Sequence, residues 1–136
     1  MPPSWILKSE PSTYSWAALV ADGRTVWDGV ASNAALLHLR AMRKGDEVLL
    51  YHSGEERAII GIAQIARGPY PDPGLDDPKR VVVDLVPVRP LKRSVTLGEI
   101  KAVPGLADLG LVRISRLSCM PVSPAHRALL RGLGVK

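Results

Sequence analysis

The stretch DEVLLYHSGEERAIIGIAQI, residues 46–65, contains two apolar runs separated by a short polar turn. Val48-Leu49-Leu50-Tyr51 predicts one strand and residues 58–65 predict a second, because both runs are short, apolar and bounded by turn residues. The intervening Ser53-Gly54-Glu55-Glu56 is typical of a hairpin turn. We therefore expect an antiparallel strand pair in the middle of the chain.

Apolar runs on either side predict further strands. These runs cover residues 5–8, 80–88 and 112–115, and a Pro- and Asp-rich loop fills residues 68–78. Strands joined by hairpins and short connections favour an antiparallel or mixed sheet with helices at its sides. We therefore predict an α+β fold: a small mixed or antiparallel β-barrel with flanking short helices, forming one domain over residues 1–136.

Helix-capping residues predict short helices between these strands. Ser15 is a suitable N-cap, and Gly23 would end the helix that it begins. Thr96 with Glu99 forms a capping-box pattern. The predicted helices, with their caps, run from Ser15 to Val20, from Ser32 or Asn33 to Met42, from Thr96 to Lys101, and from Ser123 to Leu130.

Composition indicates a folded, soluble and mildly basic protein. Hydrophobic residues make up 46% and charged residues 23%, so the chain can close one core and disorder is not expected. The formal net charge of +5 suits phosphate-bearing partners as well as simple solubility. A single cysteine, no bilayer-spanning run and no signal-peptide pattern lead us to expect no membrane partner and a cytoplasmic location.

Residues that carry metal or nucleophilic chemistry are sparse. His38, His52 and His126 do not pair at ligand spacing, so we expect no metal and no cofactor. No Gly-rich phosphate loop follows a strand, which disfavours a doubly wound parallel fold. Cys119 is either a reactive thiol or a small apolar filler, of which the second is the commoner role. His52 and Ser53 are strand neighbours that point to opposite faces, so they cannot form a dyad without a bulge.

Polar clusters follow the predicted strands at four places. If the sheet brings these strand ends together, they form a concave site with an aromatic wall and several donors and acceptors. The alternative is that each polar group caps its own local turn. The clusters are Lys8-Ser9-Glu10-Pro11, Trp27-Asp28-Gly29-Val30, Tyr51-His52-Ser53 and Ser115-Arg116-Leu117-Ser118.

These clusters, in this order, resemble the EVE domain family. The resemblance extends from residue 5 to about residue 122, which is nearly the whole chain. Further matching stretches are Trp5-Ile6-Leu7, Tyr14-Ser15-Trp16, His38-Leu39-Arg40, Lys44-Gly45-Asp46, Gly61-Ile62-Ala63, Tyr70-Pro71-Asp72-Pro73, Val95-Thr96-Leu97 with Ile100-Lys101, and Pro121-Val122.

The resemblance implies a PUA-like fold, related to YTH and ASCH domains, that binds RNA or DNA. It also implies a pocket for a flipped or modified base, in single-stranded or locally opened nucleic acid. In the roles that it implies, Trp27 and Tyr51 form the stacking wall and Asp28 and Ser9 meet the base edge. The remaining residues that it places in or beside the pocket are His52, Ser53, Arg116 and Ser118, with Lys8, Glu10 and Pro11 in a secondary position.

The helix after Trp27-Asp28-Gly29-Val30 departs from the family pattern. The family usually continues with Arg-Asn, then a Gln, then Arg-Asn. This chain has lost two cations and three amides there, which would weaken phosphate contacts. The residues at those positions are Ala31, Ser32, Ala34, Leu36 and Leu37.

The sequence therefore leaves three functions open. The first is a non-catalytic nucleic-acid-binding module. The second is a protein- or small-molecule-binding adaptor that has lost nucleic-acid affinity, with Leu36 and Leu37 as an apolar patch. The third is a hydrolase similar to ASCH relatives, with an acid–base pair drawn from Lys8, Glu10 or His52.

Overall fold

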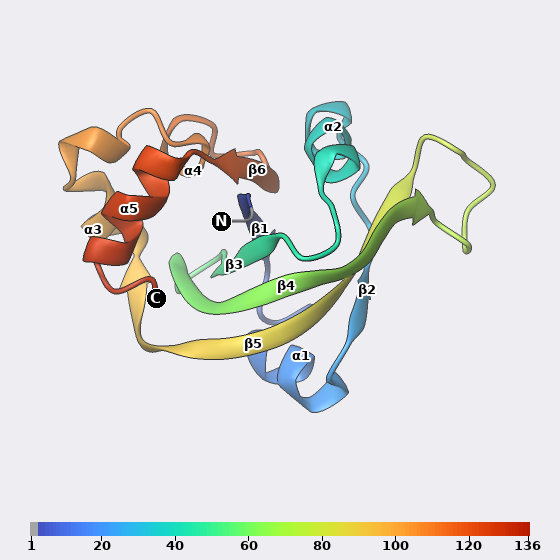
Figure 1. Cartoon of the computed structure of the whole chain (residues 1–136), viewed down its shortest axis with the longest axis horizontal. Coiled ribbons are helices and arrows are strands. Elements are labelled where there is room, and N and C mark those ends of the chain that lie inside the picture. The colour runs from blue at the N-terminus through green and yellow to red at the C-terminus, as the bar shows by residue number, and fades with distance from the viewer. Residues whose placement is uncertain (1–2) are drawn as a thin grey trace.

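A parallel pairing between the first and third strands organises the sheet (Figure 1). The computed structural model describes residues 3–136. Its strands lie in the order β2-β5-β4-β3-β1-β6, and every pairing other than β1 with β3 is antiparallel. The strands are β1 (Ser4–Ser9), β2 (Thr25–Trp27), β3 (Glu47–His52), β4 (Ala58–Pro71), β5 (Val81–Thr96) and β6 (Cys119–Val122). The predicted α+β class and mixed sheet are confirmed.

The β4–β5 hairpin gives the sheet its curvature. Figure 1 shows β4 and β5 as two long arms that bend together across the molecule. Their register shifts at several points, between Ile59 and Gly61 and again toward Tyr70. Such bulges bend strands and increase their twist. Within residues 3–136 no pairing joins β2 to β6, so the sheet is barrel-like but open.

Side-chain caps begin four of the five α-helices. The Ser15, Ser32 and Ser123 hydroxyls each accept a backbone N–H bond, and Thr96 with Glu99 completes a capping box. The predicted caps are confirmed, with Ser32 rather than Asn33 at the second helix. The helices are α1 (Trp16–Asp22), α2 (Asn33–Ala41), α3 (Leu97–Lys101), α4 (Gly110–Arg113) and α5 (Pro124–Gly132), with a 3-10 turn at Pro104–Leu106.

The strand predicted at residues 112–115 is wrong. Those residues overlap the end of α4, and the last strand is β6, whose Pro121 lies opposite Trp5 of β1. A proline is tolerated there because β6 is an edge strand and needs no second set of ladder bonds. The strands predicted at 58–65 and 80–88 are too short, since the hairpin arms extend through Pro71 and Thr96.

Two tryptophans fix the core around β1. The Trp5 indole N–H donates to the Asp46 carboxylate at 3.0 Å, which gives this buried ring a partner for its one polar atom. Trp16, the first residue of α1, packs against Gly61 on β4. Because glycine leaves room for the ring, α1 lies close to the sheet and holds the chain that follows β1.

Replacing Gly61 with alanine should therefore destabilise the fold. An added Cβ would lie 2.7 Å from the Trp16 ring. We expect a loss of about 1–3 kcal/mol in the free energy of unfolding, as for other overpacked cores. Urea unfolding measures it, with Gly132→Ala as the control because nothing lies within 4 Å of its added Cβ. Equal effects of the two substitutions would contradict the close packing of Trp16 on Gly61.

Candidate functional site

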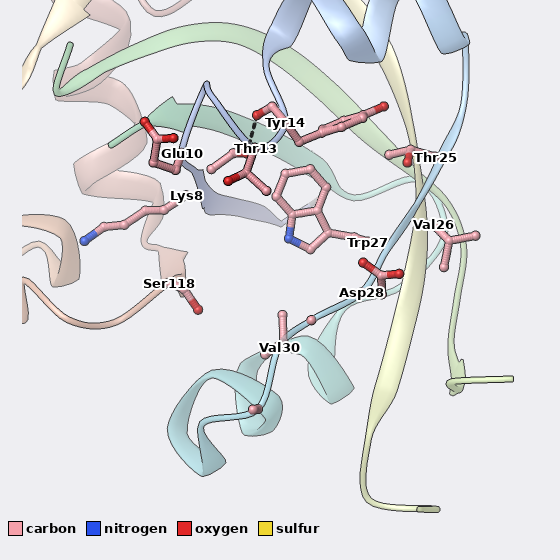
Figure 2. A pocket seen from close by; sticks show the side chains of 13 residues that line it. Lys8, Glu10, Thr13, Tyr14, Thr25, Val26, Trp27, Asp28, Val30 and Ser118 are labelled. Carbon is pink, nitrogen blue, oxygen red and sulfur yellow. Dashed lines mark hydrogen bonds between the residues drawn. The ribbon is translucent and has the colours of Figure 1, made fainter. Parts of the chain in front are cut away.

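A cavity of about 520 Å³ lies between the end of β1, the segment that follows it, and β2 with the turn after it (Figure 2). Lys8 and Glu10 line one side, and Trp27 and Asp28 line the other. Ser118, from the chain just before β6, also lines it. Residues far apart in the sequence thus meet in one cavity, because β1 lies beside β6 and the crossover from β1 to β3 carries β2.

Trp27 forms the aromatic wall of this cavity. It is the last residue of β2, where it pairs with Val83 of β5, and its side chain is mostly buried. Its ring meets Tyr14 edge-on, with ring centroids 6.1 Å apart and an interplanar angle of 81°. Within residues 3–136 the indole N–H has no hydrogen-bond partner, and Figure 2 shows that nitrogen pointing toward the space between Lys8, Ser118 and Val30. The wall therefore offers an apolar face and one unused donor.

The turn after Trp27 is held from outside the cavity. Gly29 has a φ of 79°, a left-handed conformation that favours glycine, so the chain reverses directly after Asp28. The Arg80 Nε donates to the Val30 carbonyl at 3.0 Å. The loop between β4 and β5 thereby fixes the mouth of the cavity and leaves the exposed Asp28 carboxylate at its rim.

The opposite wall is formed by residues 8–14, which are held by hydrogen bonds within this segment. The Ser9 hydroxyl donates to the Tyr14 carbonyl, and the Glu10 carboxylate accepts from the Ser12 backbone N–H at 2.9 Å and from the Ser12 hydroxyl. The hydroxyl proton of Ser9 therefore stabilises the wall of the cavity. Pro11 shapes the same segment but lines neither this cavity nor the next one.

A second cavity, of about 360 Å³, lies on the other side of Lys8. Lys8 lines both cavities, and its ammonium donates to the Ser115 carbonyl at 2.8 Å and lies 5.8 Å from the Tyr51 ring centroid. Burial lowers the pKa of Lys8. Tyr51 and Ser53 line only this second cavity, so they do not join Trp27 as the family resemblance implied.

His52 and Arg116 lie in neither cavity. His52 is buried, where its Nε2 accepts from the Trp16 backbone N–H at 3.0 Å and its Nδ1 lies 3.0 Å from a Glu56 oxygen. Arg116 is exposed in the loop between α4 and β6. The structure does not bring the whole set to one cavity, and Tyr51 and His52 separate because successive residues of a strand point to opposite faces.

Several residues of the first cavity were not singled out from the sequence. Thr13, Tyr14, Thr25 and Val26 all line it. Tyr14 could have been predicted from the sequence, since it lies in one of the stretches that resemble the EVE pattern. Thr25 and Val26 could not have been predicted in this way, because their position depends on the pairing of β2 with β5, which lies far along the chain.

Comparison with known proteins decides the family. The model of the EVE domain matches residues 4–133. This chain belongs to the EVE domain family.

Relatives of this EVE domain include bacterial and human proteins. A protein of Rhodopseudomonas palustris solved by NMR is 46% identical, with a TM-score of 0.92, over 97% of this chain and 92% of that one. The human thymocyte nuclear protein 1 is 35% identical over 72% of this chain, and the match spans only 55% of the human protein.

Human THYN1 has been solved in complex with 5-methylcytosine-containing DNA. That structure is 30% identical, with a TM-score of 0.90, over 98% of each chain. An ASCH protein from Zymomonas mobilis, at 10% identity and a TM-score of 0.58 over 96% of this chain and 97% of that one, shares the fold alone. These likenesses confirm the PUA-like architecture.

The departures in α2 have unequal consequences for this EVE domain. Ala31 is exposed and lines the first cavity, and the Ser32 hydroxyl caps the helix. Leu36 is 2% exposed and packs in the core, whereas Leu37 is 64% exposed. The expected apolar patch of Leu36 and Leu37 is therefore wrong, because only one of the two reaches the surface.

The candidate catalytic groups are not arranged as a pair. No hydrogen bond or ion pair within residues 3–136 joins any two of Lys8, Glu10 and His52. Across the same part of the chain, no three His, Cys, Asp or Glu side chains gather as metal ligands would. Nor is any described helix long and apolar enough to cross a membrane.

Cys119 should be inert in the folded protein. It is fully buried on β6, and burial raises the pKa of its thiol to about 12, so almost no thiolate forms near neutral pH. We expect iodoacetamide to leave the native protein unmodified and to alkylate one thiol after unfolding in guanidinium chloride, as measured by intact mass. Alkylation of the native protein at the rate of a free thiol would show that the thiol is reactive after all.

Proposed function

We propose that this EVE domain binds DNA by taking one unstacked base, a modified cytosine, into the cavity at Trp27, and that it does so without catalysing a reaction. The observation that carries the proposal is the Trp27 ring, whose indole N–H is unused, at the wall of a 520 Å³ cavity. Support comes also from the similarity to human THYN1, which was solved with 5-methylcytosine-containing DNA.

The size of the cavity suits a single base that lies outside the double helix. Its size lies within the range of roughly 300–1,000 Å³ that is usual for small-ligand sites. A base inside a duplex is covered on both faces by its neighbours, so only an extruded or single-stranded base can lie against the Trp27 ring. Stacking on an aromatic side chain contributes about 1–3 kcal/mol per base.

The polar groups of the cavity suit the edge of cytosine. The Asp28 carboxylate at the rim can accept from the exocyclic amine of cytosine, a pairing that acidic side chains commonly make. The Trp27 indole N–H lies in the plane of its ring, so beside a stacked base it can donate to a neighbouring sugar or phosphate oxygen. Modification at the C5 position would leave these groups available and add an apolar surface.

The alternatives have less support. A hydrolase needs an acid–base pair, yet Lys8 is bonded to the Ser115 carbonyl, Glu10 to Ser12, and His52 to Trp16 and Glu56. A protein adaptor built on α2 would need an exposed apolar face there. With Leu36 in the core, Leu37 alone does not make such a face.

Trp27→Ala should abolish most DNA binding. Loss of the stacking surface should weaken binding of a single-stranded oligonucleotide with one 5-methylcytosine by roughly ten- to a hundredfold. Fluorescence anisotropy with a labelled oligonucleotide measures the affinity. Trp27→Phe should lose less, because it keeps an aromatic face and removes only the N–H donor.

Circular dichroism and thermal melting of the Trp27 variants are the fold control, because Trp27 is also part of the core. If wild type binds neither the methylated nor the unmethylated oligonucleotide at low salt, the proposal is wrong. It is also wrong if folded Trp27→Ala and Trp27→Phe both bind as tightly as wild type.

Ala31→Arg should strengthen binding. Ala31 lines the first cavity and is exposed, so an arginine there can reach a phosphate without disturbing the core. We expect a gain of about tenfold at low salt and a steeper dependence of affinity on salt concentration. Val88→Arg is the matched control, since Val88 is exposed on β5 and lines neither cavity. Equal gains in the two variants would show that net charge, not position, is responsible.

A further inference from the structure

The second cavity carries a positive charge that the first cavity lacks. Three of its lining residues are cationic, namely Lys8, Arg57 and Lys101, and none is acidic. The first cavity instead sets Glu10 and Asp28 against Lys8. The two cavities share one side chain and differ in the kind of group that they suit.

Hydrogen bonds of its carbonyl and its Nε hold Arg57 in place and leave its two terminal nitrogens available to a ligand. It has a φ of 45°, an uncommon conformation for a residue other than glycine. Its carbonyl accepts from the Leu97 N–H at 2.7 Å, and its Nε donates to the Gly54 carbonyl at 3.2 Å. Within residues 3–136 its two terminal nitrogens have no hydrogen-bond partner.

Lys101 and Ser53 complete the polar lining. Lys101 is the last residue of α3, is exposed, and makes no ion pair within the described part of the chain. Ser53 follows β3 and adds a hydroxyl. The Glu10 carboxylate lies next to Gly54, since a Cβ added to Gly54 would come 3.1 Å from its Oε1. The same carboxylate accepts a hydrogen bond from the Ser12 backbone N–H. The acidic group thus borders the cationic cavity on the side of the first cavity.

We propose that the second cavity is a phosphate subsite, which receives the backbone phosphate beside the base held at Trp27. This rests on the proposed function for the identity of the chain that supplies the phosphate. Lysine and arginine are the usual partners of phosphate, and their contacts are charge-assisted. Lys8 spans the division between the cavities, so a base on one side and its phosphate on the other would use one continuous surface.

Lys101→Glu tests the subsite against Lys92→Glu. Both substitutions change the net charge equally, but Lys92 is exposed on β5 and lines neither cavity. We expect Lys101→Glu to bind the single-stranded 5-methylcytosine oligonucleotide about tenfold more weakly than Lys92→Glu does. The slope of log affinity against log salt should become shallower by roughly 0.7 for Lys101→Glu, as for one lost phosphate contact on a single strand. Equal losses in affinity and slope would overturn the subsite.

A second measurement separates this proposal from the proposed function. Inorganic phosphate is titrated into the ¹⁵N-labelled protein, and the backbone amides of Ser53, Gly54 and Lys101 are followed by NMR. Saturable shifts at these amides in wild type, lost in Lys101→Glu and kept in Lys92→Glu, would support the subsite even if no oligonucleotide bound. Absence of such shifts would by itself overturn the subsite, and the Trp27 variants would still test base binding separately.

Discussion

The parallel pairing of β1 with β3 is the constraint on which the site depends. Parallel neighbours cannot be joined by a hairpin, so the chain must leave the end of β1 and return to the start of β3. The crossover that results, residues 10–46, carries α1, β2 and α2, and with them the Trp27 wall and the turn beside it. The same pairing sets Lys8 opposite Tyr51 and Ser9 opposite His52. One strand end therefore borders both cavities.

Local signals in the sequence were enough to find most elements. Ser15, Ser123 and the Thr96–Glu99 box act within one helical turn, so they could be recognised without knowledge of the fold. The full length of β4 and β5 could not be recognised in this way. A proline such as Pro71 is expected to end a strand, and only the pairing with β5 shows that the strand extends through it. Strand β6 was missed for a related reason. Its Pro121 argues against a strand unless that strand is known to lie at an edge.

The candidate site was predicted in part. The Trp27-Asp28 turn and the Lys8-Ser9-Glu10 strand end do lie around one cavity. Tyr51 was placed with them on family resemblance, but strand alternation and the position of Lys8 turn it toward a separate cavity. The face of the sheet that α1 covers is set by the packing of Trp16 on Gly61 of β4, and these two residues are 45 positions apart in the sequence.

The burial of Leu36 bears on how this domain can change over evolutionary time. The side chain lies in the core, so an arginine there would bring an unpaired charge into the interior, at a cost of several kcal/mol. Neighbouring residues would have to repack before a cation could be accommodated at that position. At Ala31, on the surface, one substitution suffices. A cation can thus be gained by a single substitution at Ala31 but not at Leu36.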